Sequence, residues 1–161
     1  MAIRIARKYC KHIVLGGPHA SIYAEQCFKD CPEIDFLVIQ EGEITTPILF
    51  KKLESNESVS DVSGIAFKSD GKVVMNPSRE LIENLDSIPF PARELLPMDK
   101  YRYPISKRKN IDVIITSRGC PYNCIFCNKV MFGNKWRARS AESVIEEIEL
   151  VMKKYKIRSF I

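Results

Sequence analysis

The order of apolar runs along the first third of the chain predicts alternating strands and helices. A short apolar run at 12–15 enters a Gly-Gly turn, and residues 34–40 form a longer run typical of a strand in a parallel sheet. Helices are expected after each run, from a cap at Ser21 to about residue 30 and from a Thr46-Pro47 start to about residue 55. This order implies right-handed crossovers, with helices on both faces of the sheet.

The middle of the chain has a different pattern of apolar and polar residues. Apolar runs at 63–68 and 72–76 flank Ser69-Asp-Gly71, which is a β-hairpin signal. From 84 to 104 the chain carries four prolines. Proline fixes φ and removes a backbone donor, so this stretch is interpreted as an extended linker between modules. The side chains expected to order it are Leu85, Ile88, Phe90, Leu95 and Leu96.

The last third predicts a second strand–helix–strand unit. Residues 111–117 form an apolar strand that runs into a cysteine-rich stretch, and Ser140 is a helix cap. A new strand begins near Arg158. The helix carries apolar side chains with a period of 3.6 residues: Val144, Ile145, Ile148, Val151, Met152 and Tyr155.

Charge divides the chain into two parts. The net charge of the 161 residues is +5, but residues 1–99 carry 11 basic and 15 acidic side chains, whereas residues 100–161 carry 14 and 5. The basic part can hold an anionic substrate or nucleic acid, balance a negatively charged metal cluster, or form a solvated face. No apolar run approaches the roughly 20 residues that cross a bilayer, and the N-terminus lacks a secretory signal. We therefore expect a cytoplasmic protein without membrane partners, whose cysteines are thiols or metal ligands.

Three of the six cysteines, Cys120, Cys124 and Cys127, fall within eight residues. A structural zinc site takes four protein ligands, and the fourth would have to come from a distant part of the chain. An iron–sulfur cluster usually takes four thiolates as well, so three thiolates leave one iron open to a small molecule. The loop also follows a strand, at the sheet edge where parallel folds hold ligands. These points favour an iron–sulfur cluster over zinc.

The segment from Thr116 to Cys127 resembles the cluster loop of the radical S-adenosylmethionine superfamily, Cys-x3-Cys-x-aromatic-Cys, with Phe126 as the aromatic residue. The resemblance implies that Cys120, Cys124 and Cys127 hold a [4Fe–4S] cluster and that Phe126 lies against the adenine. In that family the open iron binds S-adenosylmethionine, and one electron cleaves it to a 5′-deoxyadenosyl radical. It further implies a small-molecule substrate and an electron-donating reductase, flavodoxin or ferredoxin. The reaction could be methyl transfer, ring rearrangement or thiomethyl-type insertion.

The first segment resembles the second half of the cobalamin-binding domain that precedes many radical S-adenosylmethionine modules. The matching stretches are Val14-Leu-Gly-Gly-Pro-His-Ala-Ser21 and Asp35-Phe-Leu-Val-Ile-Gln-Glu-Gly-Glu43. The resemblance implies that Gly16 and Gly17 let backbone approach the nucleotide tail of cobalamin, with Glu41 and Gly42 on the same edge. The Asp-x-His-x-x-Gly motif that supplies the axial histidine is absent. A tight turn without a ligand remains the alternative for the glycine pair.

Together these patterns predict an α/β chain in three segments. Residues 1–57 form a partial Rossmann-like parallel sheet, residues 58–110 a β-hairpin and proline-rich linker, and residues 111–161 the first β/α unit of a TIM-like barrel. Because such a barrel needs about 200 residues or more, we expect a fragment or split gene product without turnover on its own.

The alternative is an iron–sulfur or zinc module that uses a basic face on nucleic acid without catalysis. The basic runs at 106–109 and 135–139 motivate it, but they are a weak signal, so a nucleic-acid partner is not expected. Arg137 and Arg139 are instead expected to face an anionic cofactor or solvent, with Trp136 packed on the barrel rim. Outside the cluster loop we interpret Cys10, Cys27 and Cys31 as structural and His19 as a loop or cap residue.

Overall fold

The computed structural model describes residues 2–101 and 111–161. The chain forms two compact units. Unit 1 comprises residues 1–82 and 119–135, and unit 2 comprises residues 83–118 and 136–161. The predicted basic run at 106–109 lies outside the described residues. The three-segment division stays a prediction for the intact protein.

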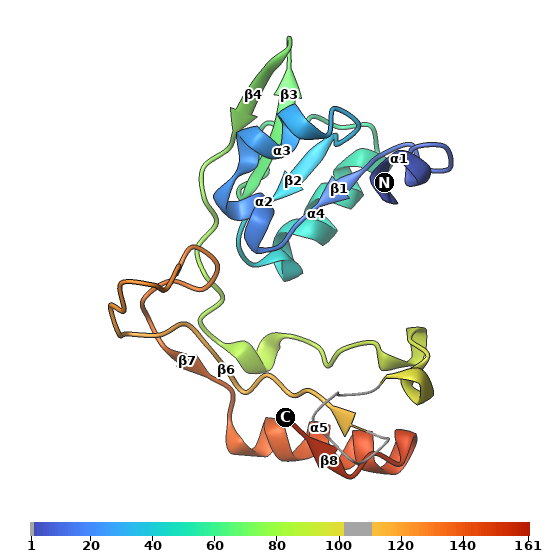
Figure 1. Ribbon diagram of the computed structural model, residues 1–161, viewed down its shortest axis with the longest axis vertical. Helices are drawn as coiled ribbons and strands as arrows, with labels where there is room; N and C mark the ends of the chain where they lie inside the picture. The colour runs from blue at the N-terminus through green and yellow to red at the C-terminus, as the bar shows by residue number, and fades with distance from the viewer. Residues whose placement is uncertain (1, 102–110) are drawn as a thin grey trace. The chain divides into compact units, whose positions relative to one another are not determined.

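Unit 1 is built on a four-stranded sheet with the order β1-β2-β3-β4 (Figure 1). β1 (Val14–Leu15) and β2 (Phe36–Val38) are parallel, which confirms the predicted parallel pair. β3 (Ile65–Ser69) and β4 (Lys72–Met75) form the predicted hairpin. β3 also pairs antiparallel with β2, so the hairpin extends the first segment's sheet, and the sheet is mixed.

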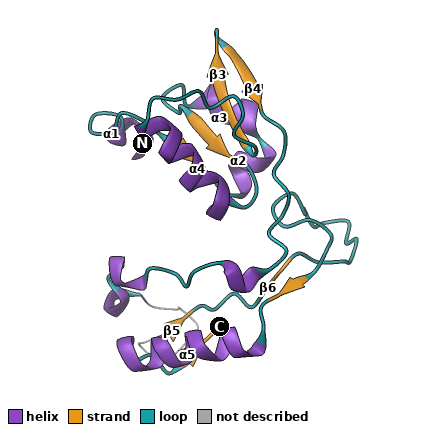
Figure 2. Ribbon diagram, turned by 180° about the vertical axis from the view of Figure 1, so that it is seen from behind, coloured by secondary structure: helices purple, strands orange, loops and turns teal. Residues whose placement is uncertain are grey.

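Helices cover both faces of this sheet, as the strand–helix order predicts. α2 (Pro18–Ile22) and α3 (Ala24–Asp30) contribute Ala20 and Phe28 to a core that includes Leu37 of β2. α4 (Gly42–Glu54) contributes Leu49 to a second core with Val38. Because Leu37 and Val38 are consecutive, they point to opposite faces of the strand. Figures 1 and 2 show the two helical layers from opposite sides, and the short helix α1 (Ala2–Ala6) adds to the first.

Both helices of unit 1 that follow a parallel strand begin earlier than the sequence predicts. α2 begins at Pro18, directly after Gly17, because proline suits the first helical position, and the Ser21 hydroxyl donates back to the Gly17 carbonyl instead of capping. α4 begins at Gly42, so Pro47 lies inside the helix and cannot donate to the carbonyl four residues earlier. Packing of buried side chains on this helix, such as Thr45, outweighs that loss.

Unit 2 contains the predicted strand–helix–strand unit. β5 (Ile111–Asp112) pairs parallel with β8 (Ser159–Phe160), and α5 (Ala141–Tyr155) lies between them in sequence. The hydroxyl of Ser140 accepts from the Ser143 N–H at 3.1 Å, which confirms the predicted cap.

The expected single strand at 111–117 is divided in two. Ile114 still donates to the Ile161 carbonyl at 3.1 Å, but the Thr116 carbonyl accepts instead from the N–H of Arg139 at 2.9 Å. β6 (Ser117–Arg118) then pairs antiparallel with β7 (Arg137–Ala138). The chain therefore changes partner midway, from β8 to the segment that leaves the cysteine-rich stretch.

Up to residue 101, where the described part of the proline-rich stretch ends, the chain forms three short 3-10 turns, at Leu85–Ser87, Arg93–Leu95 and Met98–Lys100. Leu85 is buried as expected, but Leu95 and Leu96 are exposed, so the prediction that they order the linker is wrong. Arg93 is buried instead.

A buried charge cluster explains why the arginine is inside. Arg93 forms ion pairs with Asp112 of β5 and, at 2.7 Å, with Glu147 of α5, while Arg139 pairs with the other oxygen of Glu147. Glu147 is only 1% exposed. Each oxygen of the Glu147 carboxylate pairs with a different arginine. Glu147 therefore joins the proline-rich stretch, α5 and the segment after β7.

Replacing Glu147 with glutamine should destabilise unit 2 by about 3–5 kcal/mol, because Arg93 and Arg139 would keep buried charges with only Asp112 as a carboxylate partner. Urea unfolding followed by circular dichroism measures this change. The neighbouring Glu146→Gln is the matched control, since Glu146 is exposed and should cost less than about 0.5 kcal/mol. Equal costs for the two variants would contradict the role given to Glu147.

Candidate functional site

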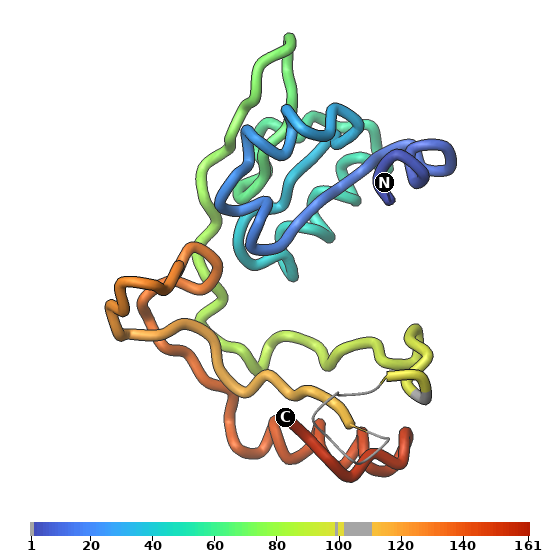
Figure 3. Tube along the Cα trace, viewed as in Figure 1, coloured from blue at the N-terminus to red at the C-terminus, as the bar shows by residue number. Residues whose placement is uncertain are grey.

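The three clustered cysteines lie on a loop whose two ends are clamped together. We call residues 119–135 the cysteine loop (Figure 3). In the β6–β7 ladder that precedes and follows it, Arg118 is paired with Arg137. Gly119 has φ 82°, and a Cβ there would lie 2.1 Å from the Lys135 carbonyl oxygen. Only glycine therefore allows the loop's first and last residues to approach this closely.

Hydrogen bonds brace the interior of the cysteine loop. The Cys127 N–H donates to the Cys124 carbonyl at 3.1 Å, and the Val130 N–H donates to Asn128 Oδ1 at 2.8 Å. Lys129 Nζ reaches back to Asn123 Oδ1 at 2.9 Å. These contacts shape the loop without using its cysteine side chains.

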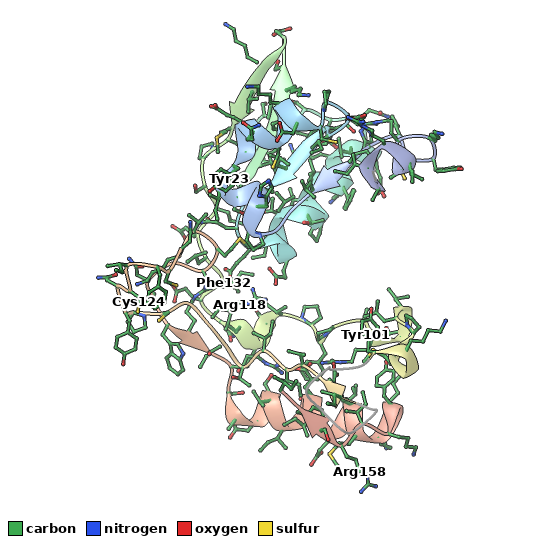
Figure 4. The ribbon with its side chains drawn as sticks, in the orientation of Figure 1. Tyr23, Tyr101, Arg118, Cys124, Phe132 and Arg158 are labelled. Atoms are coloured by element: carbon green, nitrogen blue, oxygen red, sulfur yellow. The ribbon has the colours of Figure 1, made fainter. Side chains whose placement is uncertain are left out.

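All three thiols of the loop are exposed, and none is in a disulfide. Figure 4 marks Cys124 on the loop. Among the residues that the structure describes, no group of three or more cysteine, histidine or acidic side chains is already gathered as a metal site. The thiols can turn toward one another without breaking core packing, since they make none. The donor set thus suits a cluster with three protein thiolates, whereas tetrahedral zinc would need a fourth ligand.

Aromatic and aliphatic side chains are exposed beside the thiols. Phe126 is 89% exposed, and Ile125 and Tyr122 are exposed as well. An apolar ring held in water is available to stack on a planar ligand. The adenine contact of Phe126 stays a prediction.

The four residues predicted to contact cobalamin lie at one edge of the sheet of unit 1. Gly16 and Gly17 follow β1, and Glu41 and Gly42 follow β2; the two strands are parallel, so their carboxyl ends meet at this edge. Gly17 has φ 95° and precedes the first residue of α2. Glu41 is buried, and its carboxylate accepts from the Ile82 N–H at 2.7 Å. Its contact with a cofactor, like that of the three glycines, stays a prediction.

The cysteines outside the loop have different surroundings. Cys27 is buried in the core of unit 1, and burial together with the nearby Asp30 raises the pKa of its thiol. Desolvation and a hydrogen bond to Glu33 raise the pKa of Cys31. Cys10 is exposed. His19 lies on α2 rather than in a loop, with its ring 5.4 Å from that of Tyr23.

The arginines that follow the loop are not where we expected them. Arg139 donates to the Ile115 carbonyl, pairs with Glu147 and lies 5.3 Å from the ring centre of Phe90. The expectation that Arg139 faces cofactor or solvent is therefore wrong, because its charge is used inside unit 2. Arg137 is buried as well, whereas Trp136 is 59% exposed.

Sequence reasoning missed the buried charge cluster, although one signal pointed to it. Glu147 lies three residues after Val144 and four before Val151, on the apolar face of α5. A carboxylate at such a position needs a buried cationic partner. Nothing local identifies Arg93 as that partner, since it lies 54 residues away in a proline-rich stretch.

No protein-family profile matches the chain, but individual proteins do. It is 42% identical to an uncharacterized methyltransferase of Pyrococcus horikoshii over 91% of this chain and 31% of that protein. It is 36% identical to the anaerobic magnesium-protoporphyrin IX monomethyl ester cyclase of Rubrivivax gelatinosus, over 92% of this chain and 27% of the cyclase.

Two kinds of solved structure share the fold. The cobalamin-dependent S-adenosylmethionine radical enzyme OxsB, with aqua-cobalamin and S-adenosylmethionine bound, matches 89% of this chain and 19% of its own with a TM-score of 0.71 and 28% identity. The chain is a partial match to the cobalamin-dependent radical S-adenosylmethionine enzymes. The methyltransferase TsrM from Kitasatospora setae, solved with cobalamin and a [4Fe–4S] cluster, has the same fold over 96% of this chain and 31% of its own, with a TM-score of 0.69 and 19% identity.

The chain spans less than a third of the length of these relatives. Its match covers both the glycine-edged sheet and the cysteine loop, because about nine-tenths of the chain aligns. Within the described residues, no helix has the length and apolar character that crossing a membrane requires.

Replacing Gly119 with alanine should open the base of the cysteine loop, since the added Cβ would overlap the Lys135 carbonyl. Limited proteolysis should then cut within 119–135 at least about tenfold faster, corresponding to a loss of about 1.4 kcal/mol or more of local stability. Gly71→Ala is the matched control: Gly71 also has positive φ, at 75°, but a Cβ there meets nothing within 4 Å. If both variants leave cleavage of the loop unchanged, the close approach at Gly119 does not hold its base.

Alkylation with iodoacetamide should separate the two classes of cysteine. The thiolate is the reactive form, so the raised pKa of Cys27 leaves less of it at neutral pH, and burial limits access. We expect Cys120, Cys124 and Cys127 to be labelled at least about tenfold faster than Cys27 at pH 7, and the rate at Cys27 to keep rising at a pH where ordinary thiols are fully ionised. Peptide mass spectrometry measures each site. Equal labelling of all six cysteines before unfolding would contradict this arrangement.

Proposed function

We propose that this chain is the cofactor-holding segment of a radical S-adenosylmethionine enzyme, in which Cys120, Cys124 and Cys127 ligate a [4Fe–4S] cluster. The observation that carries the proposal is the set of three exposed thiols on a loop clamped at its base, in a chain that aligns with such enzymes over both modules. When bound, a three-thiolate cluster supplies an open iron that coordinates S-adenosylmethionine and the electron that cleaves it.

The chain's own residues would prepare this site in three ways. The β6–β7 ladder and Gly119 hold the loop ends together, which limits the volume that the thiols explore before they meet iron. The internal hydrogen bonds at Cys127 and Val130 shape the loop between the thiols. The exposed ring of Phe126 would stack on the adenine of the cosubstrate.

We call the sheet edge of unit 1 that carries Gly16, Gly17, Glu41 and Gly42 the glycine edge. It would hold cobalamin as a second cofactor. Gly16 and Gly17 would let backbone approach the cofactor at the carboxyl end of β1, with Gly42 after the parallel β2 on the same edge, the position at which open α/β sheets bind ligands. Relatives named as methyltransferases favour methyl transfer to a small molecule as the parent reaction. One-electron reduction would come from a reductase, flavodoxin or ferredoxin.

Anaerobic reconstitution of the chain with ferrous iron and sulfide tests the cluster. We expect about four irons per chain, and an electron paramagnetic resonance signal of the reduced cluster that shifts when S-adenosylmethionine is added. Serine at Cys120, Cys124 or Cys127 should each lower the iron content to below about half, because a cluster held by two thiolates is labile.

Cys10→Ser is the matched control, since Cys10 is an exposed thiol in another part of the chain. Its iron content should equal that of the parent chain. The proposal fails if the chain loads only zinc, if Cys10→Ser loses as much iron as the loop variants, or if S-adenosylmethionine leaves the signal unchanged. A salt-sensitive gel shift with random oligonucleotides and no such spectral response would favour the nucleic-acid module instead.

A further inference from the structure

Gln40 joins two parts of unit 1 that are 90 residues apart in sequence. Its side-chain Nε2 donates to the backbone carbonyl of Val130 at 3.0 Å. Gln40 lies at the carboxyl end of β2, immediately before Glu41 and Gly42. Val130 lies in the cysteine loop, three residues after Cys127. The bond therefore runs from the glycine edge of the sheet to the loop that carries the thiols.

Gln40 has a backbone conformation that is unfavourable for a residue with a side chain. Its φ is 63°, in the left-handed region where glycine is favoured over residues with a Cβ. Glycine would fit this backbone with less strain. What glutamine adds at this position is therefore the amide group that reaches the loop.

A hydrogen-bond relay continues from Gln40 to the first glycine turn. The backbone N–H of Gln40 donates to Ser21 Oγ at 2.9 Å, and the Ser21 hydroxyl donates to the Gly17 carbonyl at 3.0 Å. Through Ser21 and Gln40, the turn after β1, the edge after β2 and the cysteine loop are linked by three consecutive hydrogen bonds.

The acceptor of this relay is held in a braced part of the loop. The Val130 N–H donates to Asn128 Oδ1, and the Gly133 N–H donates to the Lys129 carbonyl at 2.9 Å. Leu81 also contacts this region, since a Cβ on Gly133 would lie 3.0 Å from its Cδ1. Loss of the Gln40 bond would thus loosen the loop's position on the sheet edge without detaching it.

We propose that Gln40 is a positioning residue that sets the register of the cysteine loop on the glycine edge, and that Ser21 couples it to the turn at Gly17. This inference rests on the proposed function: the relay connects the glycine edge, where cobalamin would bind, with the cysteine loop. Any shift of the Gly17 turn when a ligand binds is passed to residues 127–133 through hydrogen bonds rather than through the solvent.

Hydrogen exchange on the metal-free chain tests the positioning role. In Gln40→Met, which keeps the length of the side chain and removes its donor, the amides of Cys127, Val130 and Gly133 should exchange about 2- to 10-fold faster. Gln26→Met is the matched control, because the Gln26 amide donates along its own helix, to Asp30 at 2.6 Å. Unchanged loop exchange in Gln40→Met, or equal acceleration in Gln26→Met, overturns the proposal.

A double-mutant cycle tests the coupling through Ser21. Because Ser21 accepts a hydrogen bond from the Gln40 backbone, Ser21→Ala should accelerate exchange of the same three loop amides, by less than Gln40→Met does. The double variant should be no faster than Gln40→Met alone, because both changes interrupt one relay. Fully additive effects, or no loop response to Ser21→Ala, overturn the coupling.

Iron retention separates this inference from the proposed function. In reconstituted chain, a chelator should remove iron from Gln40→Met about 2- to 10-fold faster than from the parent chain, while the initial iron content stays equal. A parent chain that takes up no cluster counts against the proposed function, and the exchange measurements on metal-free chain still decide the role of Gln40. If hydrogen exchange is faster in Gln40→Met but both chains release iron at the same rate, Gln40 positions the loop only in the metal-free chain. That result overturns its role at the cluster.

Discussion

The arrangement depends most on the closure of the cysteine loop at its base. Two chain segments separated by 18 residues must pair as β6 and β7, and the first residue beyond the ladder must pass against the carbonyl of Lys135. A Cβ at Gly119 would overlap the Lys135 carbonyl oxygen. The closed loop that presents the three thiols therefore requires glycine at this position. Everything proposed for the cluster presupposes this closure.

Buried charge holds the segments next to the β6–β7 ladder within unit 2. Arg139 follows β7 directly, donates to the Ile115 carbonyl on the approach to β6, and is held by Glu147 of α5. Arg93 occupies the other side of the same carboxylate. A buried ion pair is costly to desolvate, so it is a weak source of stability by itself, but removing one member leaves the others uncompensated. The cluster therefore joins the proline-rich stretch, β5, α5 and the segment after β7 within unit 2.

The same contacts change how the basic charge of the chain is understood. The excess of basic residues after residue 99 suggests a face for an anionic partner, yet Arg137 and Arg139 are both withdrawn from the surface. The cysteine loop itself exposes apolar side chains, with Tyr122, Ile125 and Phe126 all more than half exposed. A stacking surface beside three thiols suits a small planar cosubstrate better than a phosphate backbone.

Sequence by itself determined the local elements of this protein and supplied the hypothesis for its chemistry. Cysteine spacing singled out three candidate ligands, continuous apolar runs located the parallel strands, a 3.6-residue period located α5, and the Ser140 cap was placed correctly, because each depends on residues close together in the chain. Tertiary structure decided what depends on distant partners. The early start of α4, the burial of Arg93 against Glu147 and the bond from Gln40 to Val130 could not be predicted, since their energies come from packing and charge pairing between residues that no local pattern relates.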